Sequence, residues 1–202
     1  MIPATEALAR LKEGNKRYLS GGHARSAIDM QKMRDDLADG QAPFAVVLSC
    51  SDSRVPTEYV FDQHLGDLFV IRVAGNIVEP SQIASVEFAV EQLGTRLIVV
   101  MGHTRCGAVQ AALKAMEDPE FKFSIHMEAI VNRVETAIRS EPAFDSAQSH
   151  EEKCRIAGHA NVEHSVERLY SKSESLAALI SSGDVMCIGA EYSVETGIVS
   201  WL

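Results

Sequence analysis

Residues 44–54, FAVVLSCSDSR, join a short apolar run directly to a group of reactive side chains. Residues 44–48 are continuously apolar, which is typical of a strand buried on both faces of a parallel sheet. Pro43 breaks the chain just before this strand, and Cys50 comes just after it. Ligands of open α/β sheets bind beyond the carboxyl ends of the strands, so Cys50 stands where a site is expected.

A second apolar run, residues 97–101, has the same relation to reactive side chains. His103 and Cys106 follow it within the segment GHTRCG at 102–107. Apolar runs and turn signals predict further strands at 68–73 and 185–189, with an edge strand at 198–202. Helical spacing of apolar residues predicts helices at 5–19, 81–93 and 107–116, and mainly helical stretches at 121–140 and 150–181.

Strands that alternate with helices predict an α/β fold with a central, mostly parallel sheet flanked by helices. The 202 residues are enough for one sizeable core, and no linker or repeat divides them. We therefore expect a single domain over 1–202, with an N-terminal helical arm at 1–40 and an α/β core at 41–202. The first helix could cover the core of its own chain or that of a neighbour.

Charge and hydropathy exclude several classes of partner. The formal net charge is −9 and no run of Lys or Arg forms a basic patch, so nucleic acid is not an expected partner. The longest apolar runs are far too short to span a bilayer. Charged residues interrupt residues 1–19, so the apolar centre of a signal peptide is missing and a cytoplasmic protein is expected.

Two cysteines and a histidine at strand ends form a candidate metal site. Cys50, His103 and Cys106 would supply two thiolates and an imidazole, a soft ligand set that zinc accepts. Two Cys and one His with an open fourth position is an arrangement found in catalytic zinc sites.

Three other interpretations of Cys50 fit less well. A closed structural zinc site usually pairs its ligands, yet no second Cys or His lies within four residues of Cys50. A phosphatase-like nucleophile would need a phosphate-binding loop with a later Arg, but Pro56 and Thr57 occupy that region. Inert core cysteines would leave Asp52 and Arg54 beside them by coincidence.

Five motifs resemble those of the β-class carbonic anhydrases: CSDSR at 50–54, GDLFVIRVAGN at 66–76, SVEFAVEQLG at 85–94, GHTRCG at 102–107 and GAEYSVETGIV at 189–199. The resemblance covers nearly the whole chain. It implies one Zn²⁺ per chain, bound by Cys50, His103 and Cys106. Water or Asp52 would take the fourth position, Asp52 in a closed state.

The resemblance also implies the reaction, reversible hydration of CO2 to bicarbonate and a proton by attack of zinc-bound hydroxide. Asp52 would accept the hydroxide proton in a hydrogen bond, and Arg54 would hold that carboxylate off the metal. Two thiolates lower the pKa of bound water less than three imidazoles do, so activity should rise from neutral to alkaline pH. Two alternatives remain: a CS2 or COS hydrolase on the same fold, and a non-catalytic zinc-binding protein, for which Asp52 and Arg54 would be unnecessary.

Substrate contacts implied by the resemblance fall on Gln41, Phe69, Phe88 and Gly107. Gln41 could hydrogen-bond a substrate oxygen and the two rings could form a dry wall, although either ring could instead be a core residue. Many plant-type members carry Tyr in place of Phe88. Val47 stands where the allosteric type carries Trp, which favours the bacterial, plant-like, non-allosteric subtype.

Family members place their active sites at a dimer interface, with wall residues from both chains. A homodimer or a dimer of dimers is therefore expected, with CO2 and bicarbonate as small-molecule partners. Four further histidines lie in no motif that would make them proton shuttles, and most of them are expected on the surface: His64, His126, His159 and His164.

Overall fold

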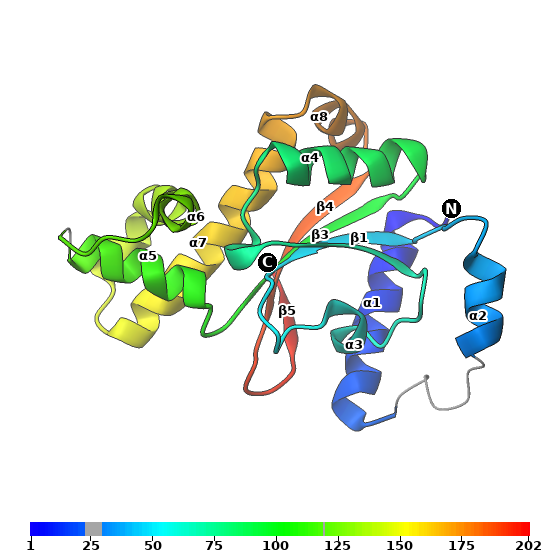
Figure 1. Ribbon diagram of the computed structural model, residues 1–202, viewed down its shortest axis with the longest axis horizontal. Coiled ribbons are helices and arrows are strands. Elements are labelled where there is room, and N and C mark those ends of the chain that lie inside the picture. Colours follow the sequence, from blue (N-terminus) through cyan, green and yellow to red (C-terminus); the bar gives the residue numbers. More distant parts are fainter. Residues whose placement is uncertain (23–29, 119) are drawn as a thin grey trace.

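A five-stranded sheet forms the centre of the computed structural model, which describes residues 1–22, 30–118 and 120–202. The strands are β1 (Ala45–Ser49), β2 (Leu68–Arg72), β3 (Leu97–His103), β4 (Met186–Tyr192) and β5 (Val199–Trp201). Their order is β2-β1-β3-β4-β5, and only β5 runs antiparallel to its neighbour (Figure 1). The predicted α/β fold with a mostly parallel sheet is confirmed.

The middle strands are apolar because both of their faces are covered. Every residue of β1 and β3 is buried. In register, Leu48 of β1 lies between Ile71 of β2 and Val100 of β3. The carboxyl ends of β1 and β3 are therefore adjacent, which brings the segments after them together.

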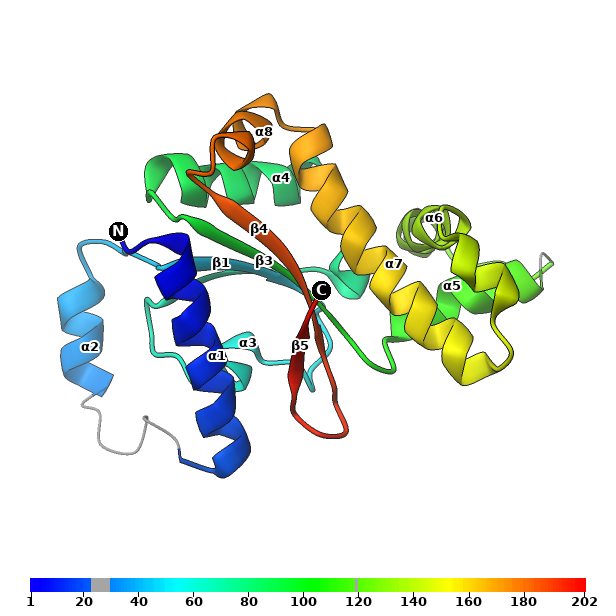
Figure 2. The same cartoon turned by 180° about the vertical axis from the view of Figure 1, so that it is seen from behind.

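Helices cover both faces of the sheet. They are α1 (Ala4–Ser20), α2 (Met30–Leu37), α3 (Thr57–Val60), α4 (Pro80–Glu87), α5 (Gly107–Glu117), α6 (Ile125–Arg139), α7 (His150–Ser171) and α8 (Glu174–Ser181). Short helical turns are η2 (Ala74–Asn76), η3 (Phe88–Gln92), which is π-helical, and η4 (Pro142–Ser146). Helices α1 and α3 lie on one face and α4, α7 and α8 on the other, while α5 and α6 extend beyond the sheet (Figures 1 and 2). None of the described helices has the length and apolar character needed to cross a membrane.

Helix α1 covers the core of its own chain. Ala7 and Leu11 are fully buried in one core cluster with Phe61 and β3 residues. The predicted arm at 1–40 also includes residues 23–29, which lie outside the described residues. The boundary at 40/41 stays a prediction.

Helix α7 lies very close to the sheet because two strand positions opposite it are glycines. A Cβ on Gly102 of β3 would come within 2.6 Å of Val162 Cγ2, and one on Gly189 of β4 within 2.9 Å of Val162 Cγ1. Real Cβ atoms do not approach so closely, so these glycines set the helix-to-sheet distance next to the end of β3.

Candidate metal centre

Cys50, His103 and Cys106 meet at the carboxyl end of the sheet. Cys50 follows β1, His103 ends β3, and Cys106 is the N-cap residue of α5. Their ligand atoms all lie within 4.8 Å of one another and all three residues are buried. The structure thus brings together the three side chains that the two motifs supply.

The imidazole of His103 is held in one tautomer. Its Nδ1 lies 2.8 Å from the carbonyl oxygen of Thr104, and because a carbonyl can only accept, Nδ1 carries the proton. Nε2 is then the atom with a free lone pair, and it is buried without a hydrogen-bond partner. A buried acceptor without a partner is costly unless a cation binds it, so Nε2 fits a metal ligand.

The two thiols are chemically different from each other. Cys50 Sγ accepts a hydrogen bond from the Gly75 N–H at 3.3 Å. A hydrogen bond from the Cys106 thiol, with further bonds from the backbone N–H groups of Gly75 and Asp52, lowers the pKa of Cys50 to about 4. The same bond to Cys50, together with burial, raises the pKa of Cys106. The arrangement therefore favours the thiolate form of Cys50 and disfavours that of Cys106, which a bound cation would stabilise.

This donor set fits zinc. Two sulfurs and an imidazole nitrogen are ligands typical of zinc, whereas hard cations such as Mg²⁺ or Ca²⁺ bind oxygen ligands. Zinc is usually four-coordinate, and the three donors leave one position for a water or a substrate atom.

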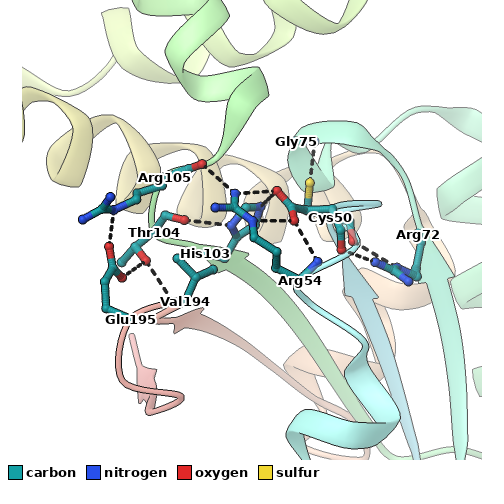
Figure 3. Close-up of polar contacts among 10 residues, drawn as sticks. Cys50, Arg54, Arg72, Gly75, His103, Thr104, Arg105, Val194 and Glu195 are labelled. Atoms are coloured by element: carbon teal, nitrogen blue, oxygen red, sulfur yellow. Dashed lines mark hydrogen bonds and ion pairs between the residues drawn. The ribbon is translucent and has the colours of Figure 1, made fainter.

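Asp52 lies beside the cluster in a fixed orientation. Arg54 donates from Nε to Oδ1 at 2.9 Å and from Nη2 to Oδ2 at 2.7 Å, while its backbone N–H also donates to Oδ1 (Figure 3). Asp52 Oδ2 lies 3.8 Å from His103 Nε2. The Arg54 side chain holds the pKa of Asp52 well below its usual range. An ionised carboxylate, able only to accept, therefore faces the region into which Nε2 points.

Arg72 fixes the backbone of the first motif, a contact that sequence reasoning missed. Its Nε donates to the carbonyl of Cys50 at 3.0 Å and its Nη2 to that of Asp52 at 2.5 Å (Figure 3). Arg72 ends β2 in register with Ser49, so sheet pairing alone brings it to this loop. A prediction that β2 pairs with β1 in this register would have been needed to place Arg72 beside Cys50 and Asp52.

Comparison with known proteins identifies the family. A family model described as carbonic anhydrase matches residues 45–199, which include all three clustered ligands and Asp52. The chain belongs to the carbonic anhydrase family. The β-carbonic anhydrases are zinc enzymes, which agrees with the donor set.

The relatives extend over nearly the whole chain. It is 36% identical over 201 residues to carbonic anhydrase 2 of Mycobacterium tuberculosis, covering 97% of this chain and 93% of the relative. Two solved β-carbonic anhydrases, each 26% identical, share the fold. One is from Coccomyxa, in complex with acetazolamide, with a TM-score of 0.76 over 96% of this chain and 86% of the other. The other is a tetrameric enzyme from Sordaria macrospora, with a TM-score of 0.73 over 85% and 87%.

The predicted substrate residues of this carbonic anhydrase lie in two places. Gly107 opens α5, directly after the ligand Cys106. Gln41 is exposed before β1, and Phe69 lies near the start of β2, with its ring centroid 6.1 Å from that of Phe88. Phe88 is 49% exposed, so it is not a core residue of this chain. Within one chain, these three residues lie toward the amino ends of β1 and β2, away from the metal ligands.

Proposed function

We propose that this carbonic anhydrase hydrates CO2 reversibly to bicarbonate and a proton, with zinc held by Cys50, His103 and Cys106. Asp52 and Arg54 are the catalytic pair. One observation carries the proposal: a buried Cys-His-Cys cluster with an orphaned His103 Nε2 lies next to a carboxylate that Arg54 holds ionised.

The chain's own residues orient the reactants. Zinc, when bound, supplies a Lewis acid that lowers the pKa of a water and so makes a nucleophile available near neutral pH. Asp52 accepts a hydrogen bond from that nucleophile at a carboxylate oxygen, which turns an oxygen lone pair toward CO2. Arg54 keeps the carboxylate in place and charged, so that Asp52 accepts rather than donates.

The same contacts support a switch between two states. In the open state Arg54 holds Asp52 in a two-point pair, as the structure has it. If the Arg54–Asp52 pair opened, the Asp52 carboxylate would be free to serve as the fourth zinc ligand in place of water. The 3.8 Å separation of Asp52 Oδ2 and His103 Nε2 supports this closed state, because only a small movement is needed.

Gln41, Phe69 and Phe88 line the active site of a partner subunit in this proposal. Their place toward the amino ends of β1 and β2, and the half-exposed ring of Phe88, support a contribution across an interface. Gly107, at the N-terminus of α5, offers a backbone N–H beside Cys106 in its own chain. The protein is then a homodimer, and dimers pair further if it assembles like the tetrameric Sordaria enzyme.

Subtype and location complete the proposal. Val47 is fully buried in β1, which supports the non-allosteric, plant-like subtype because the Trp of the allosteric type is missing. A cytoplasmic location is supported by the chemistry of the thiols: all four cysteines are free, and the two ligands must stay reduced to bind a metal.

Parallel assays of three substrates test the proposed function. Protein of measured zinc content is assayed for CO2 hydration by stopped flow, and for COS and CS2 hydrolysis, before and after zinc removal and restoration. We expect fast CO2 hydration that is lost without zinc and recovered with it. Hydrolysis of CS2 or COS without CO2 hydration would support the alternative enzyme, and no activity on any substrate would support a non-catalytic zinc protein.

A further inference from the structure

The C-terminal motif at 189–199 has no role in the proposed mechanism, yet one of its side chains reaches the metal centre. The hairpin between β4 and β5 carries Glu195 to the turn that links His103 to Cys106. Thr104 Oγ1 donates to Glu195 Oε2 at 2.6 Å, and Arg105 Nε donates to Glu195 Oε1 (Figure 3). One carboxylate thus holds both residues that separate the two ligands.

The turn at Thr104 and Arg105 needs such support. Arg105 has a φ of 55°, in the left-handed region that residues with a Cβ rarely adopt. The carbonyl of Thr104 accepts from His103 Nδ1, and Cys106 follows directly. A change in the conformation of this turn would therefore move both the Thr104 carbonyl, which bonds His103, and the thiol of Cys106.

The turn also connects Glu195 to the catalytic pair. Arg54 Nη2 donates to the carbonyl oxygen of Arg105 at 3.2 Å, in addition to its bonds to Asp52 (Figure 3). This third acceptor fixes the guanidinium plane, and the plane fixes the carboxylate of Asp52. The path runs from Glu195 through Arg105 and Arg54 to Asp52.

Glu195 is itself held rigidly, unlike an ordinary surface acid. Ser193 Oγ donates to its Oε2 at 3.2 Å, and the turn closes with the Gly197 N–H donating to the Ser193 carbonyl at 2.8 Å. The side chain of Asn15 in α1 makes two hydrogen bonds to the backbone of the hairpin. It donates to the Gly197 carbonyl at 3.0 Å and accepts from the Val199 N–H at 3.1 Å. The Thr104 hydroxyl, with Arg105, holds the pKa of Glu195 at about 2, so it stays ionised across the assay range.

We propose that Glu195 is a positioning residue for CO2 hydration, which fixes the His103–Cys106 turn and, through Arg105 and Arg54, the orientation of Asp52. An isolated, exposed ion pair contributes little to the stability of a protein. Glu195 differs because its two partners are consecutive residues between metal ligands and one of them is in a left-handed conformation. The inference rests on the proposed function.

Two variants and one matched control test it. Glu195→Ala removes the carboxylate, and Glu195→Gln keeps an acceptor oxygen but loses the charge. Asp184→Asn is the control, because Asp184 also pairs with an arginine, Arg96, at the opposite end of β4. We expect Glu195→Ala to lower kcat about tenfold with little change in KM, Glu195→Gln to lower it less, and Asp184→Asn to leave kcat unchanged.

Two further readouts separate positioning from general support of the fold. In a double-mutant cycle with Arg54→Ala, the double variant should lose less activity than the product of the two single losses, because part of the effect of Glu195 runs through Arg54. Transfer of zinc to a chromophoric chelator should be faster for Glu195→Ala than for wild type or Asp184→Asn.

The outcomes are distinguishable. Wild-type kcat and zinc transfer in Glu195→Ala would overturn the inference, as would a loss of activity that matches a loss of thermal stability and adds to that of Arg54→Ala. Either result leaves an active wild-type enzyme and the proposed function intact. An inactive zinc-loaded wild type would overturn the proposed function, while zinc transfer would still report whether Glu195 fixes the turn.

Discussion

The planar guanidinium of Arg54 contacts both carboxylate oxygens of Asp52, and in the proposed mechanism this pair orients Asp52 toward the substrate. We predict that Arg54→Lys and Arg54→Ala both lower kcat for CO2 hydration, on the order of a hundredfold, since a single ammonium cannot replace a two-point contact. Stopped-flow assays of variants with wild-type zinc content measure this. Arg96→Ala, which removes an exposed arginine far from the cluster, is the control. Equal activity of Arg54→Lys and wild type would contradict the role.

At the residue scale, the sequence predicted the clustered side chains but not those that hold them. Cys50, His103 and Cys106 were predictable because each follows an apolar strand and carries distinctive chemistry. Arg72 and Glu195 were not predicted, because a charged side chain at a strand end or hairpin tip looks like ordinary surface. Their roles depend on contacts between segments far apart in the chain, which only the folded structure places together.

At the scale of elements, the close contact between α7 and the sheet gives the next prediction. Gly102→Ala places a Cβ against Val162 and should destabilise the protein by about 1–3 kcal/mol through overpacking. Val162→Ala alone should also destabilise, by leaving a cavity. In urea unfolding, the double variant should lose less free energy of unfolding than the two single variants lose together, because the smaller side chain at 162 makes room for the added Cβ at 102. Strict additivity would show that the two side chains do not compete for space.

A second element-scale prediction concerns the ion pair between α7 and β4. His159 Nε2 lies 3.2 Å from Glu191 Oε2, and this bond raises the pKa of His159 above its ordinary value of 6.5. The pair therefore adds stability that is fully present below pH 6.5 and is lost as the pH rises through the higher, folded-state pKa.

Unfolding free energies test this pair. Between about pH 6 and about pH 8, His159→Gln should lose less stability than wild type, since the variant lacks the titrating pair. His126→Gln, at an exposed position on α6, should behave like wild type. A wild-type slope in His159→Gln would show that the pair contributes nothing measurable.

Among the elements, those with strong apolar patterns were predicted well. The predicted strand at 185–189 is too short, because Glu191 interrupts the apolar pattern although it pairs with Gly102 of β3. Helix α2 (Met30–Leu37) was not predicted as a separate element of the helical arm at 1–40, because it is short and most of its residues are charged or polar. Most of the four histidines outside the motifs were expected at the surface, but His159 is partly buried and pairs with Glu191 at that missed end of β4.

For the whole molecule, the proposed dimer explains why Phe88 is exposed. We predict that the protein is a dimer or larger by light scattering, and that Phe88→Asp weakens the assembly and lowers CO2 hydration together. Ile125→Asp is the matched control, because Ile125 on α6 is 76% exposed and has no proposed role. A fully active monomer would contradict the shared active site.

The central claim is that the Cys50, His103 and Cys106 cluster, with Asp52 held by Arg54, hydrates CO2 when zinc is bound. Stopped-flow hydration from neutral to alkaline pH, on protein whose zinc content has been measured, tests it most directly. The account predicts rapid hydration that requires zinc and rises with pH, because two thiolates lower the pKa of a zinc-held water less than three imidazoles do. A protein with one zinc per chain that hydrates no CO2 at any pH would contradict it.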